Sequence, residues 1–354
     1  MSRFFSEKFA SLTPYTPGEQ PKDRKYLKLN TNESPFSPSE ETMKAALEEL
    51  DRLQLYPDPD CSELVKAMAE LLGVKPSQVM ITNGSDEVLN YAFLAYADEK
   101  APLVMPDITY GFYTSVAEYN RVSYEEIPLK EDFTIDINDY MGIGKTIVIP
   151  NPNAPTGIAL ELSDIEKILA SNPDNIVIID EAYVDFGAES AVALIDRYEN
   201  LIVSQTFSKS RSLAGARLGV AVADEKIIQD LNTLRYASNP YNINRVSMAV
   251  GIAAIKTNSY YMNNCRVIAE NREYTAERLG EMGFDVIPSK SNFLLAKSDS
   301  ISGERLYERL KDEKGVLIRH FNKERIKEYN RITIGTREQM DACLDAVREI
   351  LETE

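Results

Sequence analysis

The sequence predicts an α/β protein built around a mostly parallel sheet. Short runs rich in Val and Ile alternate with longer amphipathic stretches, which is the pattern of parallel strands joined by crossover helices. Polar residues follow directly after several of these runs, at the edge where open α/β sheets bind ligands. After about residue 250 the pattern changes to long charged helical segments around short apolar runs. These observations together predict a large sheet domain followed by a smaller α+β domain.

The elements of the large domain follow from its apolar runs. Val79–Thr82 is predicted to be a strand, followed by a turn over 83–86 and a helix through about Tyr96. Residues 62–72 and 161–171 have helical spacing of apolar side chains. Leu218–Val222 follows the preceding run too soon for a helical crossover, so we expect it to run antiparallel to its neighbour. The other predicted buried strands are Leu103–Met105, Thr146–Ile149, Ile176–Ile179 and Leu201–Ser204.

The chain divides into three predicted parts. Residues 1–44 form an N-terminal arm whose prolines and Gly18 make it too irregular to fold alone, so we expect it to pack on the small domain or on a partner subunit. Residues 45–250 form the large domain and residues 251–354 the small one. Within the small domain, strands are expected at Phe293–Ala296 and Arg331–Ile334.

Charge and composition exclude several classes of protein. Lys and Arg number 39 against 56 Asp and Glu, and the net charge of −17 repels nucleic acid and anionic lipid. No segment has the apolar length of a signal peptide or a membrane span, so we expect a cytoplasmic protein that binds neither nucleic acid nor membrane. The odd number of scattered cysteines predicts no disulfide framework and no metal site. The single histidine, His320, is expected to be a solvated or locally bonded side chain.

Lys209 is the residue that first indicates chemistry. It follows an apolar strand and lies between hydroxyls and arginines. Near the end of a buried strand the pKa of a lysine falls, and the neutral amine can attack an aldehyde to form a Schiff base. Thr206, Ser208 and Arg217 supply hydroxyls and a planar cation that suit a phosphate dianion. A lysine that extends from a strand end to solvent would explain the segment alone equally well, so the assignment depends on its neighbours.

Two other strand ends supply complementary groups. Asp180 ends the most apolar strand, where an unpaired carboxylate is costly and a protonated pyridine nitrogen would satisfy it. Tyr183 can offer its phenol to a ring oxygen, although packing explains a lone tyrosine as well. Gly84, Ser85 and Asp86 open a helix whose N–H groups and dipole can hold a phosphate, with simple helix capping as the alternative.

These features stand in the order and spacing of a known family. The chain resembles pyridoxal-phosphate enzymes of the aspartate aminotransferase fold, and more closely the histidinol-phosphate aminotransferases. The resemblance implies a large domain with a mostly parallel seven-stranded sheet between helices, a smaller α+β domain, and pyridoxal 5'-phosphate as cofactor. The matching segments are Pro14-Tyr-Thr-Pro-Gly18, Asn30-Thr-Asn-Glu-Ser-Pro-Phe36, Tyr56-Pro-Asp58, Asn83-Gly-Ser-Asp-Glu87, Thr109-Tyr-Gly-Phe-Tyr113, Asn151-Pro-Asn-Ala-Pro-Thr-Gly157, Asp180-Glu-Ala-Tyr183, Ser208-Lys209 with Arg217, and Arg331-Ile-Thr-Ile-Gly-Thr336.

The resemblance also implies a role for each matching residue toward the cofactor. Lys209 would hold it as a Schiff base, Asp180 would pair with its pyridine nitrogen, and Tyr183 would bond its ring hydroxyl. Tyr110 would stack on the ring, and Tyr56 would reach the phosphate from the neighbouring subunit, which implies a homodimer with shared sites. The phosphate would lie among Gly84, Ser85, Asp86, Thr206, Ser208 and Arg217.

One position departs from the family pattern. The residue before Pro-Thr-Gly is usually an asparagine that bonds the cofactor's ring oxygen, and here it is Ala154. A methyl group cannot donate that bond. Asn153, or Tyr183 together with a water molecule, is the candidate replacement.

The implied reaction is ping-pong amino transfer between L-glutamate and imidazole-acetol phosphate, which gives 2-oxoglutarate and histidinol phosphate in L-histidine biosynthesis. An aromatic aminotransferase and a threonine-phosphate decarboxylase of the same fold stay open, because few pocket residues recognise the side chain. A non-catalytic cofactor-binding regulatory module would need a basic DNA-reading domain, which we do not expect in this chain. The substrate anion is expected to bind Arg331, with Arg319, Tyr15 and Asn32 at the pocket mouth.

Overall fold

A seven-stranded sheet forms the centre of the computed structural model, which describes residues 2–10 and 12–354. The strand order is β2-β8-β7-β6-β5-β3-β4. β8 is antiparallel to both of its neighbours, and the other pairs are parallel. The strands are β2 (Val79–Thr82), β3 (Leu103–Pro106), β4 (Tyr124–Ile127), β5 (Thr146–Pro150), β6 (Val177–Asp180), β7 (Leu201–Thr206) and β8 (Gly219–Ala223).

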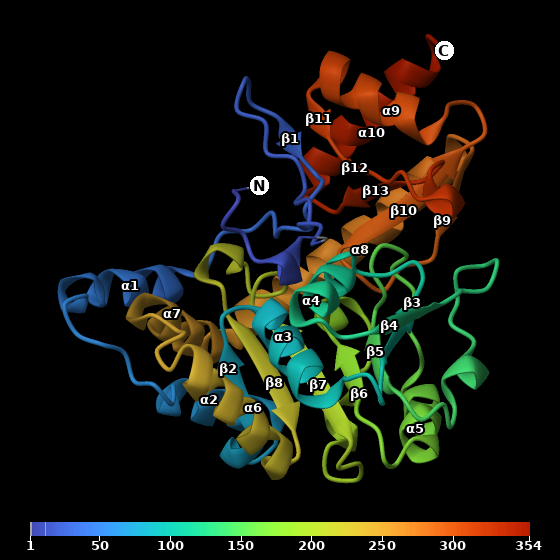
Figure 1. The fold of residues 1–354 in the computed structure, drawn as a ribbon. Helices are drawn as coiled ribbons and strands as arrows, with labels where there is room; N and C mark the ends of the chain where they lie inside the picture. Colours follow the sequence, from blue (N-terminus) through green and yellow to red (C-terminus); the bar gives the residue numbers. More distant parts are fainter. Residues whose placement is uncertain (1, 11) are drawn as a thin grey trace.

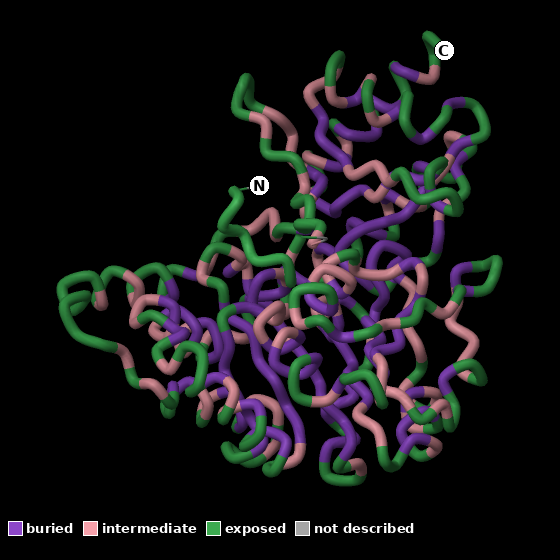
Figure 2. The backbone as a smooth tube through the Cα atoms, in the orientation of Figure 1, coloured by how far each residue is buried: buried purple, intermediate pink, exposed green. Residues whose placement is uncertain are grey.

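Alternate side chains of these strands bury two separate cores (Figures 1 and 2). Ile147 and Ile179 belong to the core that α2, α5 and α7 cover, whereas Val148 and Ile178 belong to the core that α3, α4 and α6 cover. Strands buried on both faces must be apolar throughout, which explains their continuous runs of Val and Ile. The helices are α1 (Glu40–Glu48), α2 (Ser62–Leu72), α3 (Ser85–Tyr96), α4 (Phe112–Asn120), α5 (Leu162–Ser171), α6 (Glu225–Ser238) and α7 (Arg245–Lys256).

The predicted α/β class is confirmed, and so is the antiparallel orientation of the strand after Lys209, because β8 pairs antiparallel with β7. The predicted strand ends differ from the observed ones by no more than two residues. Sequence reasoning missed β4. This edge strand has an intermediate or exposed side chain at every position, including Glu125 and Glu126, so no apolar run marks it.

A second sheet and three helices form the smaller part of the molecule. Its four strands, in the order β12-β13-β10-β9, are all antiparallel. The long helix α8 joins the two parts, because its Tyr261 lies in the core of the large sheet and its Ile268 in the core of the small one. The elements are α8 (Asn258–Glu281), β9 (Phe284–Ile287), β10 (Phe293–Ser298), α9 (Gly303–Arg309), β11 (Val316–Leu317), β12 (Arg319–His320), β13 (Asn330–Thr333) and α10 (Arg337–Leu351).

The N-terminal segment runs alongside the small sheet. Its strand β1 (Leu27–Lys28) pairs in parallel with β11, and Figure 1 shows it beside the last helices of the chain. Residues 1 and 11 of the predicted arm lie outside the described residues, and the domain boundaries at 44 and 250 stay a prediction. Cys61, Cys265 and Cys343 are free and buried. No helix among the described residues has the length and apolarity needed to cross a membrane.

Candidate active site

A cleft of about 890 Å³ lies where the carboxyl ends of the parallel strands face the small sheet. Strands of one sheet deliver their terminal residues to the same edge, which explains why distant parts of the sequence meet there. Most of the residues predicted from the sequence line this cleft. They are Tyr15, Asn32, Ser85, Asp86, Tyr110, Asp180, Tyr183, Thr206, Ser208, Lys209, Arg217, Arg319 and Arg331.

Lys209 follows β7 and extends its amine into the cleft. Its Nζ donates a hydrogen bond to the backbone oxygen of Thr31 at 3.1 Å and lies 6.0 Å from the centre of the Tyr183 ring. The pKa of Lys209 is lowered from 10.5 to about 8. Burial is the main cause, and the positive charge of Arg331 is the second. A substantial fraction of the amine is therefore neutral and nucleophilic at mildly alkaline pH.

Asp180 ends β6 and is only 4% exposed. It accepts hydrogen bonds from Tyr113 Oη at 2.8 Å and from the backbone N–H of Ala182 at 3.3 Å. Burial raises its pKa from 3.8 to about 6. Within the described residues Asp180 takes part in no ion pair, so its carboxylate suits a cationic group of a ligand in the cleft. Sequence reasoning missed Tyr113, although it belongs to the matched segment Thr109–Tyr113.

Tyr183 follows Asp180 by three residues and also lines the cleft. Its Oη accepts a hydrogen bond from Asn32 Nδ2 at 2.9 Å, and its ring packs edge-on against Phe293 with the centroids 5.1 Å apart. Burial raises the pKa of Tyr183, while the charge of Arg331 opposes that rise. Tyr183 is therefore a neutral phenol held between the arm and the small sheet.

The turn before α3 and the segment after β7 form an anion-binding corner. Arg217 donates to Asp86 Oδ2 at 3.0 Å and to Ser208 Oγ at 3.5 Å, and Thr206 Oγ1 donates to Ser208 Oγ at 3.0 Å. Gly84 has φ +78°, and a Cβ there would stand 2.6 Å from the guanidinium of Arg217. The corner therefore combines a guanidinium, hydroxyls and the N-terminus of α3, which are groups that bind phosphate. We call it the phosphate corner.

Aromatic side chains wall the cleft beside this corner. The rings of Tyr15 and Tyr110 lie edge to face at 6.2 Å, and Tyr110 Oη donates to Asp86 Oδ1 at 3.3 Å. Burial raises the pKa of Tyr15 and of Tyr110, so both phenols stay neutral. Aromatic side chains in such a wall can pack against an aromatic ligand.

Two arginines close the far side of the cleft. Arg331 on β13 stacks on Phe293 at 5.2 Å and donates from one terminal nitrogen to the oxygen of Asn30 at 3.0 Å. Burial lowers its pKa, and its Nε has no protein partner among the described residues. Arg319 on β12 lies over Phe321 at 5.7 Å. The pair can hold an anionic part of a ligand.

Three predicted residues lie outside the lining of the cleft. Gly84 shapes the phosphate corner from behind. Tyr56 is 79% exposed and stacks on Tyr241 at 4.7 Å on the surface of the large domain. Asn153 is buried, and its amide donates to the oxygen of Ile108 and to Thr156 Oγ1, both at 3.0 Å. The structure therefore presents Ala154, not Asn153, to the cleft.

His320 is a locally bonded side chain, as the sequence predicts. Its Nδ1 lies 3.3 Å from Asn330 Oδ1, and its ring stacks on Tyr307 at 5.9 Å. His320 also lines the cleft, which the sequence did not indicate.

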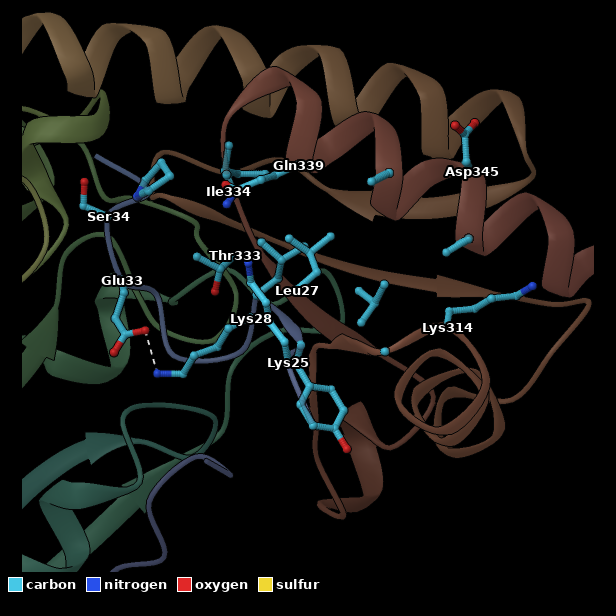
Figure 3. A pocket seen from close by; sticks show the side chains of 18 of the residues that line it. Lys25, Leu27, Lys28, Glu33, Ser34, Lys314, Thr333, Ile334, Gln339 and Asp345 are labelled. Carbon is cyan, nitrogen blue, oxygen red and sulfur yellow. Dashed lines mark hydrogen bonds and ion pairs between the residues drawn. The ribbon is translucent and has the colours of Figure 1, made fainter. Parts of the chain in front are cut away.

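A second cavity, of about 820 Å³, lies between the arm and α10 (Figure 3). Lys28 and Glu33, which line it, pair with each other at 2.7 Å, and Lys314 pairs with Glu349 at 2.6 Å. None of its lining residues belongs to the predicted site. The cleft at the strand ends is therefore the candidate active site.

The profile of the family described as aminotransferase class I and II matches residues 24–347. The chain belongs to this aminotransferase family. It is 49% identical to the histidinol-phosphate aminotransferase of Brachyspira hyodysenteriae and 48% identical to that of Marinomonas sp., over 99% of this chain and 100% of each relative. These full-length relatives place this aminotransferase among the histidinol-phosphate aminotransferases.

A solved structure supports the fold of the aminotransferase independently. The histidinol-phosphate aminotransferase of Sinorhizobium meliloti, described in complex with pyridoxal-5'-phosphate, superposes with a TM-score of 0.90 at 22% identity. The match covers 100% of this chain and 99% of that one. The predicted fold is therefore confirmed over the whole length.

Proposed function

We propose that this protein transfers an amino group between L-glutamate and imidazole-acetol phosphate, giving 2-oxoglutarate and histidinol phosphate in L-histidine biosynthesis. The observation that carries the proposal is the meeting of Lys209 and Asp180 with the phosphate corner in one cleft of a chain about half identical to full-length histidinol-phosphate aminotransferases. The cytoplasmic location stays a prediction.

The residues of the cleft fit pyridoxal 5'-phosphate. Near Asp180, which forms no ion pair within the described residues, the hydroxyl of Thr109 is buried and has no partner in the same part of the chain, which is unusual unless a ligand satisfies it. Arg217, Ser208 and the N-terminus of α3 would hold the phosphate, and Tyr110 would pack on the ring. When bound, the cofactor would supply an aldehyde carbon and a ring that takes up the electrons of a broken Cα–H bond.

In the proposed reaction the residues of the chain bind, orient and move protons. Lys209 would carry the cofactor and, once released, take the proton from the substrate Cα, for which a pKa of about 8 suits physiological pH. Asp180 would hold a proton on the ring nitrogen. Tyr183 would donate its phenol to the ring oxygen. The aromatic wall would exclude water from the reacting atoms.

Both substrates carry an anion at a distance from the amino group, and the arginines lie where they could bind it. The Nε of Arg331 is buried and has no partner among the described residues, and Arg319 is half-buried on the lining of the cleft. A guanidinium can bind a carboxylate or a phosphate through two parallel hydrogen bonds. One site could therefore accept glutamate and histidinol phosphate in turn, with Tyr15 and Asn32 beside them.

We also propose that the enzyme works as a homodimer in which Tyr56 completes the partner's phosphate site. Tyr56 is mostly exposed and lies outside its own cleft, yet the segment that carries it is fastened to the large domain. Arg245 of α7 binds Glu49 at 2.8 Å and the backbone oxygen of Tyr56 at 3.3 Å. An ordered, exposed tyrosine suits a contact with a second copy.

The decisive experiment compares kcat/KM for histidinol phosphate, phenylalanine and aspartate as amino donors to 2-oxoglutarate. We expect histidinol phosphate to be preferred and product formation to follow ping-pong kinetics. A preference for phenylalanine would replace the proposal with an aromatic aminotransferase, and release of CO₂ from threonine phosphate would replace it with a decarboxylase. In Lys209→Ala, turnover and the visible absorption band of the bound cofactor should both be lost.

A further inference from the structure

The segment 30–34 bridges the two sides of the cleft. On the small-sheet side, the oxygen of Asn30 accepts from Arg331 at 3.0 Å. On the large-sheet side, the oxygen of Thr31 accepts from Lys209 at 3.1 Å, and Ser34 Oγ lies 2.8 Å from Ser212 Oγ. Figure 3 shows Glu33 and Ser34 of this segment running past Thr333 of β13. The segment therefore contacts catalytic groups from both sheets.

Within this segment, Asn32 forms the largest number of hydrogen bonds. Its backbone N–H donates to Thr333 Oγ1 at 3.0 Å, and its backbone oxygen accepts from Asn292 Nδ2 at 3.0 Å. The residue is 1% exposed and has φ +57°, a left-handed conformation that asparagine tolerates better than most residues. The two backbone hydrogen bonds therefore hold Asn32 in place independently of the contact between its side chain and Tyr183.

The orientation of the Asn32 amide follows from Thr333. Because Thr333 Oγ1 already accepts from the N–H of Asn32, its own hydrogen is free to point to Asn32 Oδ1, which lies 3.0 Å away. In this arrangement the amide oxygen faces Thr333, whose hydroxyl donates to it, and the NH₂ group faces Tyr183 Oη at 2.9 Å.

Since Asn32 donates to the phenol oxygen of Tyr183, the phenol hydrogen has to point elsewhere. No oxygen or nitrogen among the described residues accepts it, and Tyr183 lines the cleft. We infer that Asn32 is a positioning residue that turns the phenol O–H of Tyr183 into the cleft as a donor to the bound cofactor. This inference rests on the proposed function.

The same arrangement explains how the cleft could bind the cofactor although Ala154 stands where the family usually has an asparagine. Ala154 offers a methyl to the cleft, and the amide of Asn153 is already bonded to Ile108 and Thr156. Tyr183 is then the donor to the ring oxygen of the cofactor. Asn32 strengthens this donor, because a phenol that accepts a hydrogen bond donates a stronger one. Asn32 thus acts on the cofactor through Tyr183.

A double-mutant cycle on the full chain tests the inference. Asn32→Gly removes the side chain but keeps the left-handed backbone and both backbone hydrogen bonds. In the wild-type background we expect it to raise the Kd of apoprotein for pyridoxal 5'-phosphate about three- to tenfold. The pH midpoint of the cofactor's visible band should also move upward, because a weaker donor stabilises negative charge on the cofactor less. In the Tyr183→Phe background both effects should nearly vanish.

Asn30→Ala is the matched control, since Asn30 is an equally buried asparagine of the same segment whose amide donates to the oxygen of Glu19 at 2.9 Å. Its effect on the Kd should be the same with or without Tyr183→Phe, and thermal unfolding verifies that every variant is folded. Additive effects of Asn32→Gly and Tyr183→Phe, or an unshifted spectral midpoint, would overturn the inference while leaving the proposed function intact. Failure of the wild type to bind the cofactor would instead refute the proposed function.

Discussion

Lys209 and Asp180 are buried ionisable residues with displaced pKa values. Burial lowers the pKa of Lys209 to about 8 and raises that of Asp180 to about 6. Neither side chain forms an ion pair within the part of the chain that the structure describes. Both groups therefore weaken the folded state of the protein alone, and a ligand of complementary charge would recover that free energy on binding.

Asp180→Asn should stabilise the cofactor-free protein at pH 8. The folded pKa of Asp180, about 6, lies above the ordinary 3.8, so the folded state binds this proton more tightly and its stability falls as the pH rises from about 4 to about 6. Removing the carboxylate should raise the free energy of unfolding by up to about 3 kcal/mol at pH 8 and by much less at pH 4. Urea unfolding at both pH values measures the difference, and an equal change at both would contradict the burial argument.

The residues that sequence could identify are those at strand ends, because parallel strands deliver their last residues to one edge. Asp180 and Lys209 were found in this way. Tyr113 and the backbone oxygen of Thr31 were not, because a buried tyrosine looks like ordinary packing and a carbonyl has no sequence signature. The sequence predicts that Asn32 meets the substrate, whereas its contact with Tyr183 depends on a left-handed turn that a single sequence does not reveal.

At the scale of elements, the close approach of β8 to the turn before α3 shapes the phosphate corner. A Cβ at Gly219, the first residue of β8, would lie 2.3 Å from the backbone carbon of Gly84 and 2.4 Å from the nitrogen of Ser85. The absent side chain lets the antiparallel strand pack directly against the turn. The sequence predicts the strand and the turn separately. It does not predict their contact, because that depends on the order of the strands, in which β8 lies next to β2.

Gly219→Ala should damage the phosphate corner, since the new methyl must push the Gly84–Ser85 backbone away. Overpacking of this kind costs about 1–3 kcal/mol, and the Kd for pyridoxal 5'-phosphate should rise with it. Gly280→Ala is the control, because no atom lies within 4 Å of a Cβ there and it belongs to α8; it should stabilise the protein by about 1 kcal/mol. Urea unfolding and equilibrium dialysis measure both effects, and unchanged binding in Gly219→Ala would contradict the role given to this contact.

At the scale of the whole molecule, the segment from α1 to α2 carries an apolar surface that its own chain leaves uncovered. Figure 1 shows this segment projecting from the side of the large sheet, and Figure 2 shows much of it exposed. Scattered exposed apolar residues are normal, but a group of them marks an interaction surface. Leu47, Leu50, Leu53 and Leu55 are each more than half exposed and lead directly to Tyr56.

Leu53→Glu together with Leu55→Glu should convert the proposed dimer to monomers, because two buried carboxylates without partners are costly at an interface. If Tyr56 reaches the partner's phosphate corner, the same change should also weaken cofactor binding, although both leucines lie outside the cleft. Met141→Glu, at an exposed apolar residue after the short helix Ile137–Tyr140, should leave assembly and cofactor affinity unchanged. Sedimentation velocity measures the assembly state and equilibrium dialysis the Kd. A variant that becomes monomeric with unchanged affinity would separate dimerisation from the site and refute the shared role of Tyr56.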